Sequence, residues 1–235
     1  MSDTMLISSK PSFGAPLLMK WGARALVICA AGVVFTMLCV RESQINGRLA
    51  TTPNYDDIVY FHNGAILLKS VEAKGFSGIQ LFMNERGLHS PFSIFLAATA
   101  YGVLGFSDSA PYFANLLVIL VYLAFISWFL RSLGFLDWMA ALVLFLTPPF
   151  VTMGVVEFRP DIAWAVVTAF GVVWIVTSKN VFCRPGGAAA AGLFLALSLV
   201  IKPSTFVMTT ILYTGAVVSR MCSGVWERRY RTEMR

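Results

Sequence analysis

The chain has 235 residues, of which 57% are hydrophobic and 13% charged, and its mean hydropathy is +0.74. Soluble domains carry about 25% charged residues, so this composition excludes an ordinary soluble fold and predicts an integral membrane protein. The net charge of +6 comes from basic residues between apolar segments, which argues against nucleic acid as a partner. The four cysteines form no CxxC pair, so neither a disulfide framework nor a metal cluster is predicted.

The first apolar segment, residues 25–40, has the basic flank of a signal peptide, with Lys10, Lys20 and Arg24 before it. It has no clear small-residue cleavage site, and the chain stays hydrophobic after it. We therefore interpret it as a retained first membrane helix that follows a cytoplasmic N-terminus, residues 1–24.

Five further apolar segments approach the length of a membrane span, which takes about 20 helical residues. They are residues 111–130, 138–156, 162–177, 188–201 and 205–218. The second of these segments is interrupted by Pro148-Pro149, and Pro203 predicts a break in the helix at Lys202-Pro203. The expected fold is an all-α polytopic membrane protein with about six transmembrane helices.

Residues 91–106 are also apolar but short for a span, and they suit a helix that lies at the membrane surface. If this segment crossed the membrane, the arginine-rich end of the chain would lie outside, against the positive-inside bias. We therefore place it on the outer surface, with both termini in the cytoplasm. The predicted organisation is a transmembrane domain, residues 25–218, with one long outer loop, 41–110, and a basic cytoplasmic tail, 219–235.

The long outer loop contains a predicted amphipathic helix that begins after the N-cap candidate Asn54 and ends before Gly75. Its apolar positions recur at spacings of three and four residues: Ile58, Phe61, Ala65 and Leu68. Asp56 and Asp57 lie in its first turn, where carboxylates favour the helix dipole. Like-charge repulsion could instead raise the pKa of one carboxyl, which suits a general base acting on an acceptor hydroxyl. The residues alone leave both interpretations open.

A short outer segment between two predicted spans carries three charges, on Glu157, Arg159 and Asp161. Charges at membrane depth usually face a cavity or each other. This segment is either an exposed loop with an arginine–carboxylate pair or a site where Arg159 binds phosphate, whose oxygens match the planar guanidinium.

Two single residues have the same ambiguity. His89 opens the predicted surface helix and is either a polar boundary residue or a site residue. Lys202 interrupts an apolar segment and either snorkels to the interface or contacts a phosphate. In the predicted topology both lie on the outer face, together with the acidic pair and Arg159.

The order of these features resembles the N-terminal half of the GT-C glycosyltransferases, the membrane-embedded superfamily of protein O-mannosyltransferases and the lipid A aminoarabinose transferase. The family's Asp-Glu-x-x-Tyr loop is similar to Asp56-Asp57-Ile58-Val59-Tyr60, and its His-Pro-Pro-Leu helix start to His89-Ser90-Pro91-Phe92. Its Arg-Pro-Asp turn and later Lys-Pro break are similar to Arg159-Pro160-Asp161 and Lys202-Pro203. The resemblance covers residues 25–218. Asp57 in place of Glu, and Ser90 in place of Pro, depart from the pattern.

The resemblance implies transfer of a sugar from a polyprenyl-phosphate donor to a hydroxyl acceptor on the outer face of a bacterial inner membrane. The catalytic residues it implies are the base Asp56 and its neighbour Asp57. The substrate-binding residues it implies are His89, Arg159, Asp161 and Lys202. Paired carboxylates can bind a divalent metal, although nothing in the sequence demands one. Family members have more membrane helices, so we expect the chain to be a fragment, a truncated paralogue or one piece of an assembly.

Two alternatives from other classes are open. In a structural or assembly subunit of a membrane complex, the acidic pair would cap a helix and the basic tail would contact lipid or partner subunits. Half of a transporter would have repeats or paired broken helices, and the sequence has one clear break, at Lys202-Pro203. An enzyme requires Asp56, His89, Arg159 and Lys202 to converge on one cavity, whereas a subunit does not.

Overall fold

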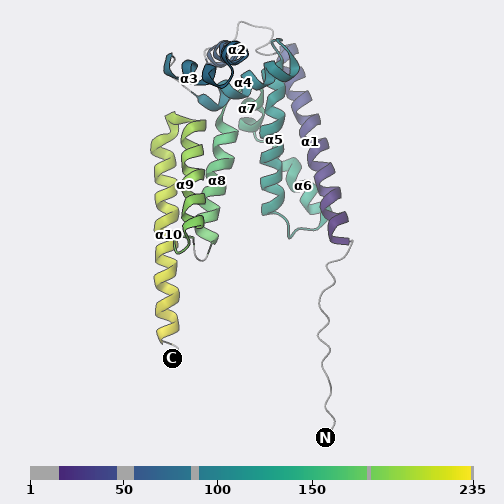
Figure 1. The fold of residues 1–235 in the computed structure, drawn as a ribbon. Helices are drawn as coiled ribbons and strands as arrows, with labels where there is room; N and C mark the ends of the chain where they lie inside the picture. The colour runs from purple at the N-terminus through teal and green to yellow at the C-terminus, as the bar shows by residue number, and fades with distance from the viewer. Residues whose placement is uncertain (1–15, 47–55, 86–89, 179–180, 234–235) are drawn as a thin grey trace.

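The computed structural model describes residues 16–46, 56–85, 90–178 and 181–233, and its regular elements in these ranges are all helical (Figure 1). This confirms the all-α prediction. The helices, in chain order, are α1 (Pro16–Asn46), α2 (Asp56–Lys74), α3 (Phe76–Glu85), α4 (Pro91–Leu104), α5 (Ala110–Phe129), α6 (Phe135–Leu146), α7 (Pro149–Val156), α8 (Asp161–Thr177), α9 (Pro185–Ile201), the short 3-10 turn η1 (Pro203–Thr205) and α10 (Phe206–Glu233).

In the described part of the chain, three helical segments are long and apolar enough to cross a membrane: Gly22–Ile45 in α1, all of α5, and Pro203–Ser223, which includes most of α10. Helices α6 and α7 meet the same criterion as a pair that is bent by 61°. Pro148 and Pro149 explain the bend, because proline lacks the amide hydrogen and clashes with the preceding turn. Many large apolar side chains on these helices are exposed, as lipid-facing side chains are. The chain is an integral membrane protein.

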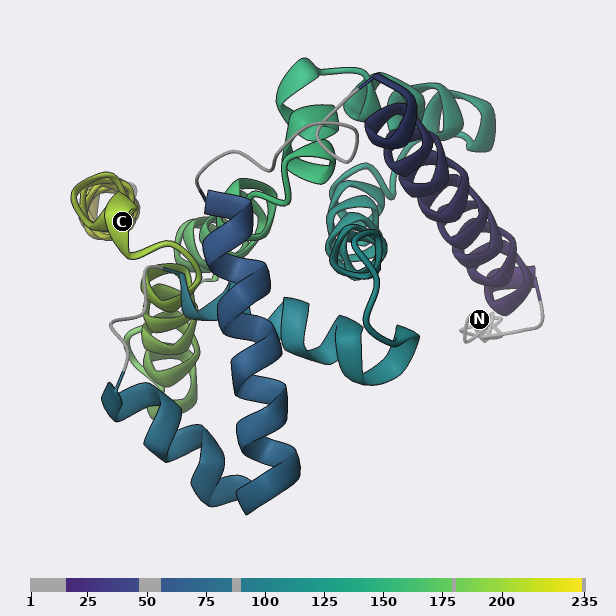
Figure 2. The same ribbon diagram turned by 90° about the horizontal axis from the view of Figure 1, so that it is seen from above.

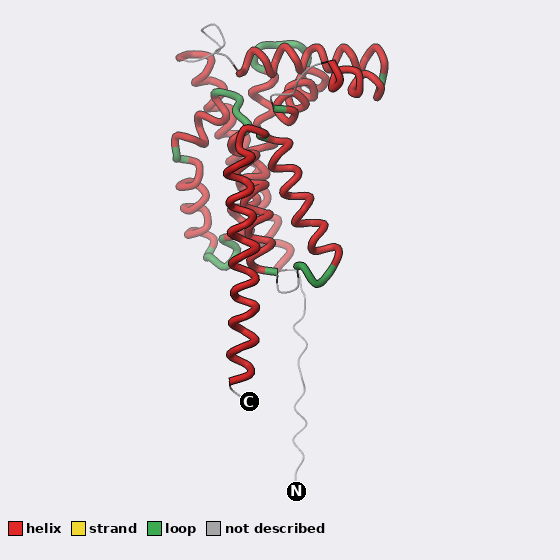
Figure 3. Tube along the Cα trace, turned by 90° about the vertical axis from the view of Figure 1, so that its left-hand side faces the viewer, coloured by secondary structure: helices red, strands yellow, loops and turns green. Residues whose placement is uncertain are grey.

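The helices form a bundle with a layer across one end. Helices α1, α5, α8, α9 and α10 run roughly along one direction, whereas α2, α3 and α4 lie across one end of the bundle (Figures 1 and 3). Seen from above, α2 crosses over the ends of the bundle helices (Figure 2). We call the covered end the outer end and the opposite one the inner end. Helices α8 and α9 have 17 residues each and are the shorter members of the bundle.

The outer layer contains one helix that the sequence analysis did not predict. Helix α2 ends at Lys74 as expected, and Gly75 then adopts a φ of 61°, which reverses the chain into α3. Gly78 brings α3 against the end of α2, since a Cβ there would lie 2.2 Å from the Ser70 carbonyl oxygen. The Ser70 hydroxyl donates a hydrogen bond to the Gly78 carbonyl at 3.0 Å. The described residues between α1 and α5 therefore form three helices, α2, α3 and α4.

Helices α2 and α4 approach each other closely at Gly64. A Cβ at this position would lie 2.8 Å from the Ala97 Cβ, 3.0 Å from the Ala98 nitrogen and 3.2 Å from the Ile94 oxygen. Two of these atoms belong to the α4 backbone, so a side chain at residue 64 can be accommodated only if one helix moves. Small residues at helix contacts allow such close packing.

We expect Gly64→Val to separate α2 from α4 and to lower stability by about 1–3 kcal/mol, the usual range for overpacking. Thermal unfolding of the purified protein in detergent measures the change. Gly102→Ala on α4 is the matched control, because a Cβ there would meet only the Leu68 Cδ1 at an ordinary 3.6 Å. An unchanged melting temperature in Gly64→Val would contradict the close approach.

At the inner end, Arg24 ties α1 to the turn between α5 and α6. Its guanidinium donates hydrogen bonds to the carbonyls of Arg131, at 3.1 Å, and Leu133, at 2.9 Å. The same group lies over the Trp138 ring, 5.1 Å from the centroid. This basic residue near the start of the first span therefore also has a packing role.

Candidate functional site

Helix α2 begins at Asp56, so the predicted acidic pair does occupy the first turn of a helix at the outer end. The side chains of Asp56 and Asp57, and all of His89, lie outside the described residues. Nearby residues of the chain that are described include Tyr60 and Ser90.

The α7–α8 turn is held against α2 by an aromatic cluster around Phe158. The Phe158 side chain is 1% exposed. Its ring centroid lies 5.2 Å from that of Phe61, 6.5 Å from that of Tyr60 and 6.1 Å from that of Tyr112. Tyr60 is one helical turn after Asp56, and Phe158 immediately precedes Arg159. The second turn of α2 therefore packs against the charged turn.

Phe158 also has an unusual backbone conformation. Its φ is 49°, in the left-handed region that glycine normally occupies after a helix. The Arg159 amide bonds to the Gly154 carbonyl at 2.9 Å and the Phe158 amide to that of Val155 at 3.3 Å, the Schellman pattern that ends α7. The buried ring offsets the conformational strain, which is of order 1 kcal/mol. This turn sets the direction of the Arg159 side chain.

Arg159 forms an ion pair with Glu157 in the same turn. The Arg159 side chain is 53% exposed and that of Glu157 is 15% exposed. The arginine–carboxylate pair anticipated for this segment is present. The exposed guanidinium keeps donors available on its solvent side, because it has five N–H groups in total.

Lys202 forms an ion pair with Asp161, across 41 residues of sequence. Asp161 is the first residue of α8, and Lys202 follows the last residue of α9. Each was predicted to bind substrate, and the structure pairs them with each other. The two side chains are 26% and 40% exposed for Lys202 and Asp161, respectively.

Ser90, directly before α4, forms a hydrogen bond to the residue that precedes Lys202. Its buried hydroxyl donates a hydrogen bond to the Ile201 carbonyl at 2.9 Å and lies 3.2 Å from the Ser93 hydroxyl. Ser90 directly follows His89, and Ile201 directly precedes Lys202. The start of α4 is therefore attached to the residue beside the lysine.

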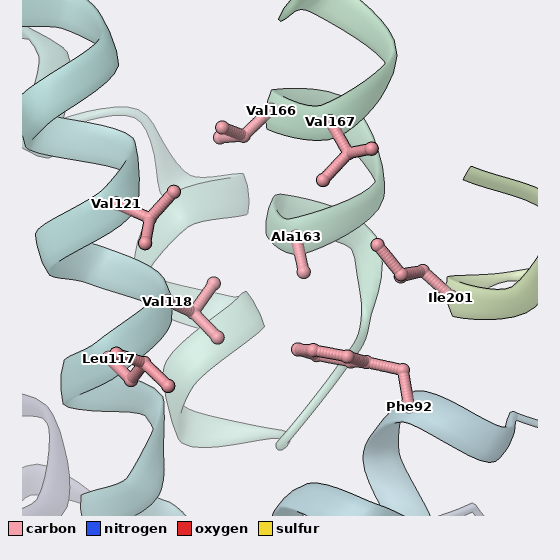
Figure 4. A pocket seen from close by; sticks show the side chains of 8 residues that line it. All are labelled: Phe92, Leu117, Val118, Val121, Ala163, Val166, Val167 and Ile201. Carbon is pink, nitrogen blue, oxygen red and sulfur yellow. The ribbon is translucent and has the colours of Figure 1, made fainter. Parts of the chain in front are cut away.

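An apolar cavity of about 170 Å³ lies between α5 and α8 (Figure 4). The side chains of Phe92 from α4 and Ile201 from α9 line it together with side chains of α5 and α8 (Figure 4). Leu117 and Val121 on its α5 wall are 60% and 45% exposed, so it opens toward lipid. The lining residues are Phe92, Leu117, Val118, Val121, Ala163, Val166, Val167 and Ile201. All eight side chains are hydrocarbon, which suits an apolar chain.

The sequence analysis missed three contributors to this region. Glu157, the partner of Arg159, was noted only as one of three charges, and Ser90 only as a departure from a family pattern. Phe158 gave a signal that was not used, since a bulky residue between two charges at a helix end suggests a buried anchor. No sequence pattern indicated the cavity, because its walls come from four helices.

Among the described side chains, no group of three or more His, Cys, Asp or Glu residues is arranged to hold a metal ion. Comparison with known proteins finds no match: no family model, no curated sequence and no solved structure is similar to this chain. The class that the fold itself defines is a helical integral membrane protein with a helical layer over one end.

Proposed function

We propose that the protein takes part in sugar transfer from a polyprenyl-phosphate donor to a hydroxyl acceptor at its outer end. The observation that carries this proposal is that four separate segments meet there. Helix α2 packs on Phe158, which precedes Arg159, and Ser90 bonds to Ile201, which precedes Lys202. The ion pair between Asp161 and Lys202 then joins α8 to α9. A subunit without a ligand would not need these positions together.

The proposed roles follow from the chemistry of each group. Asp56 takes the proton from the acceptor hydroxyl, and Asp57 provides the second acidic position. Arg159 and Lys202 stabilise the charge on the leaving phosphate. Stabilisation of developing charge is usually the largest electrostatic contribution to catalysis. His89 lines the donor site, and Asp161 is paired with Lys202 beside it. In a single displacement, the acceptor oxygen forms a bond to the anomeric carbon of the sugar while the bond from that carbon to the phosphate oxygen breaks.

The proposed topology has six spans: α1, α5, the α6–α7 pair, α8, α9 and α10. Both termini then lie in the cytoplasm of a bacterial inner membrane. Arginines toward the inner end of the described structure support this orientation by the positive-inside bias. They are Arg24, Arg131, Arg184 and Arg220.

A structural or assembly subunit is the second candidate, and one observation favours it. Arg159 and Lys202 both have carboxylate partners within the chain, so neither requires a ligand to neutralise its charge. The two candidates differ in whether the protein consumes a donor.

The test is reconstitution of the purified protein in liposomes with a pool of polyprenyl-phosphate sugars and hydroxyl acceptors. Mass spectrometry measures the donor that is lost and the glycosylated acceptor that forms. Donor loss that depends on the protein supports sugar transfer. Folded, monodisperse protein that consumes no donor would favour the subunit, and co-purification would then identify the partner subunits.

A further inference from the structure

We propose that Asp161 is the resident counter-ion of Lys202, and that the phosphate of a polyprenyl monophosphate displaces it. The lipid chain then lies in the cavity between α5 and α8. This inference rests on the donor class of the proposed function, and it concerns how that site exchanges one anion for another.

The backbone at Lys202 is held by hydrogen bonds from several elements. Its carbonyl accepts hydrogen bonds from the Thr205 hydroxyl, at 2.7 Å, and the Thr205 amide, at 3.1 Å. Its amide donates to the Ser198 carbonyl at 3.2 Å, and the preceding Ile201 carbonyl accepts from Ser90. These bonds, from α4, α9 and η1, fix the backbone from which the ammonium extends.

Asp161 is the member that can leave. Its side chain is 40% exposed, against 26% for Lys202, so the carboxylate reaches water more readily than the ammonium does. A partly buried ammonium needs an anionic partner, whereas a displaced carboxylate can be hydrated. Repulsion between like charges disfavours phosphate and carboxylate on the same ammonium. Binding of an anionic headgroup is therefore an exchange with Asp161.

The cavity supplies the apolar half of the site. Ile201 and Ala163 line it, and they are one and two residues from Lys202 and Asp161, respectively. Both of these lining residues lie near the outer end of the bundle, because α8 begins and α9 ends there (Figures 1 and 4). A ligand with an anionic head and a hydrocarbon chain fits this combination. The lysine identifies the headgroup as anionic.

The experiment measures binding of polyprenyl monophosphate to the protein in phosphatidylcholine nanodiscs by native mass spectrometry. No sugar is present, so the result does not depend on transfer. We expect Asp161→Asn to tighten binding roughly fivefold, as removal of a competing, partly exposed ion pair allows. Lys202→Met should weaken it roughly tenfold. Asp161→Glu keeps the competing charge, so the gain expected for Asp161→Asn should not appear in it. The control outside the site is Asp108→Asn on the exposed turn before α5, which should leave the affinity unchanged.

The proposed position of the lipid chain in the cavity is tested in parallel. Val121→Trp fills the cavity from its exposed α5 wall and should weaken binding, whereas Val143→Trp on the exposed face of α6 is the matched control. If Asp161→Asn does not assemble, Asp161→Ser removes the same charge. Unchanged or weaker binding after removal of this charge would overturn the exchange. If Asp161→Asn tightened the binding of phosphatidic acid by the same factor, the proposal that the ligand is a polyprenyl phosphate would be overturned. Tighter polyprenyl phosphate binding without transfer would leave the exchange standing and refute the proposed function.

Discussion

Asp56→Asn is expected to reduce sugar transfer roughly 100- to 10,000-fold, the range for loss of a general base. The amide keeps the size of the side chain and its ability to cap the first turn of α2, but it cannot accept the acceptor's proton. Stability should therefore change little. The initial rate of donor consumption in liposomes, together with the melting temperature, measures both quantities.

Glu72→Gln is the matched control for this substitution, because Glu72 is exposed near the other end of the same helix. It removes one carboxylate from α2 and should leave transfer unchanged. Full activity in Asp56→Asn together with loss of activity in Asp57→Asn would show that Asp57, and not Asp56, is the base. Full activity in both single variants and in the double variant would refute a base at this position.

Phe158→Ala is expected to lower the free energy of unfolding by about 3–5 kcal/mol, as for other fully buried phenylalanines. The ring packs against Phe61, Tyr60 and Tyr112, so its loss leaves a void between α2 and the α7–α8 turn. The same change should loosen Arg159 relative to α2 and lower any transfer activity. Thermal or denaturant unfolding in detergent measures the effect on stability.

Phe158→Gly separates the effect of the buried ring from the effect of the positive φ at this residue. It also removes the ring, but it relieves the φ of 49°, so it should be less destabilising than Phe158→Ala by about 1 kcal/mol. Phe150→Ala is the matched control, since that phenylalanine is on α7 and 56% exposed. Equal stability of Phe158→Ala and Phe150→Ala would show that the cluster does not hold the turn.

The positions of most helices were predictable from the sequence. Six apolar segments and the surface segment each correspond to a helix, with the 138–156 segment divided into α6 and α7 at its prolines. Long apolar segments and proline breaks are local signals, so they need no knowledge of the rest of the fold. Helix α3 was missed because it has only 10 residues and follows α2 after a single glycine.

The candidate site was predictable only as a set of residues. Charges at span ends drew attention to Arg159, Asp161 and Lys202, but the sequence did not show which of them would meet. The structure pairs Lys202 with Asp161 across 41 positions and leaves Arg159 with its near neighbour Glu157. Partner choice depends on how α8 packs against α9, which is a property of the folded chain.

The sequence alone determined that this is a helical membrane protein, because apolar composition and segment length act residue by residue. Tertiary structure alone decided three features: the attachment of Ser90 to Ile201, the anchoring of Phe158 on α2 and the apolar cavity beside Lys202. Each depends on side chains from different helices meeting at one end of the bundle. Such contacts are set by packing between distant segments, and no local pattern records them.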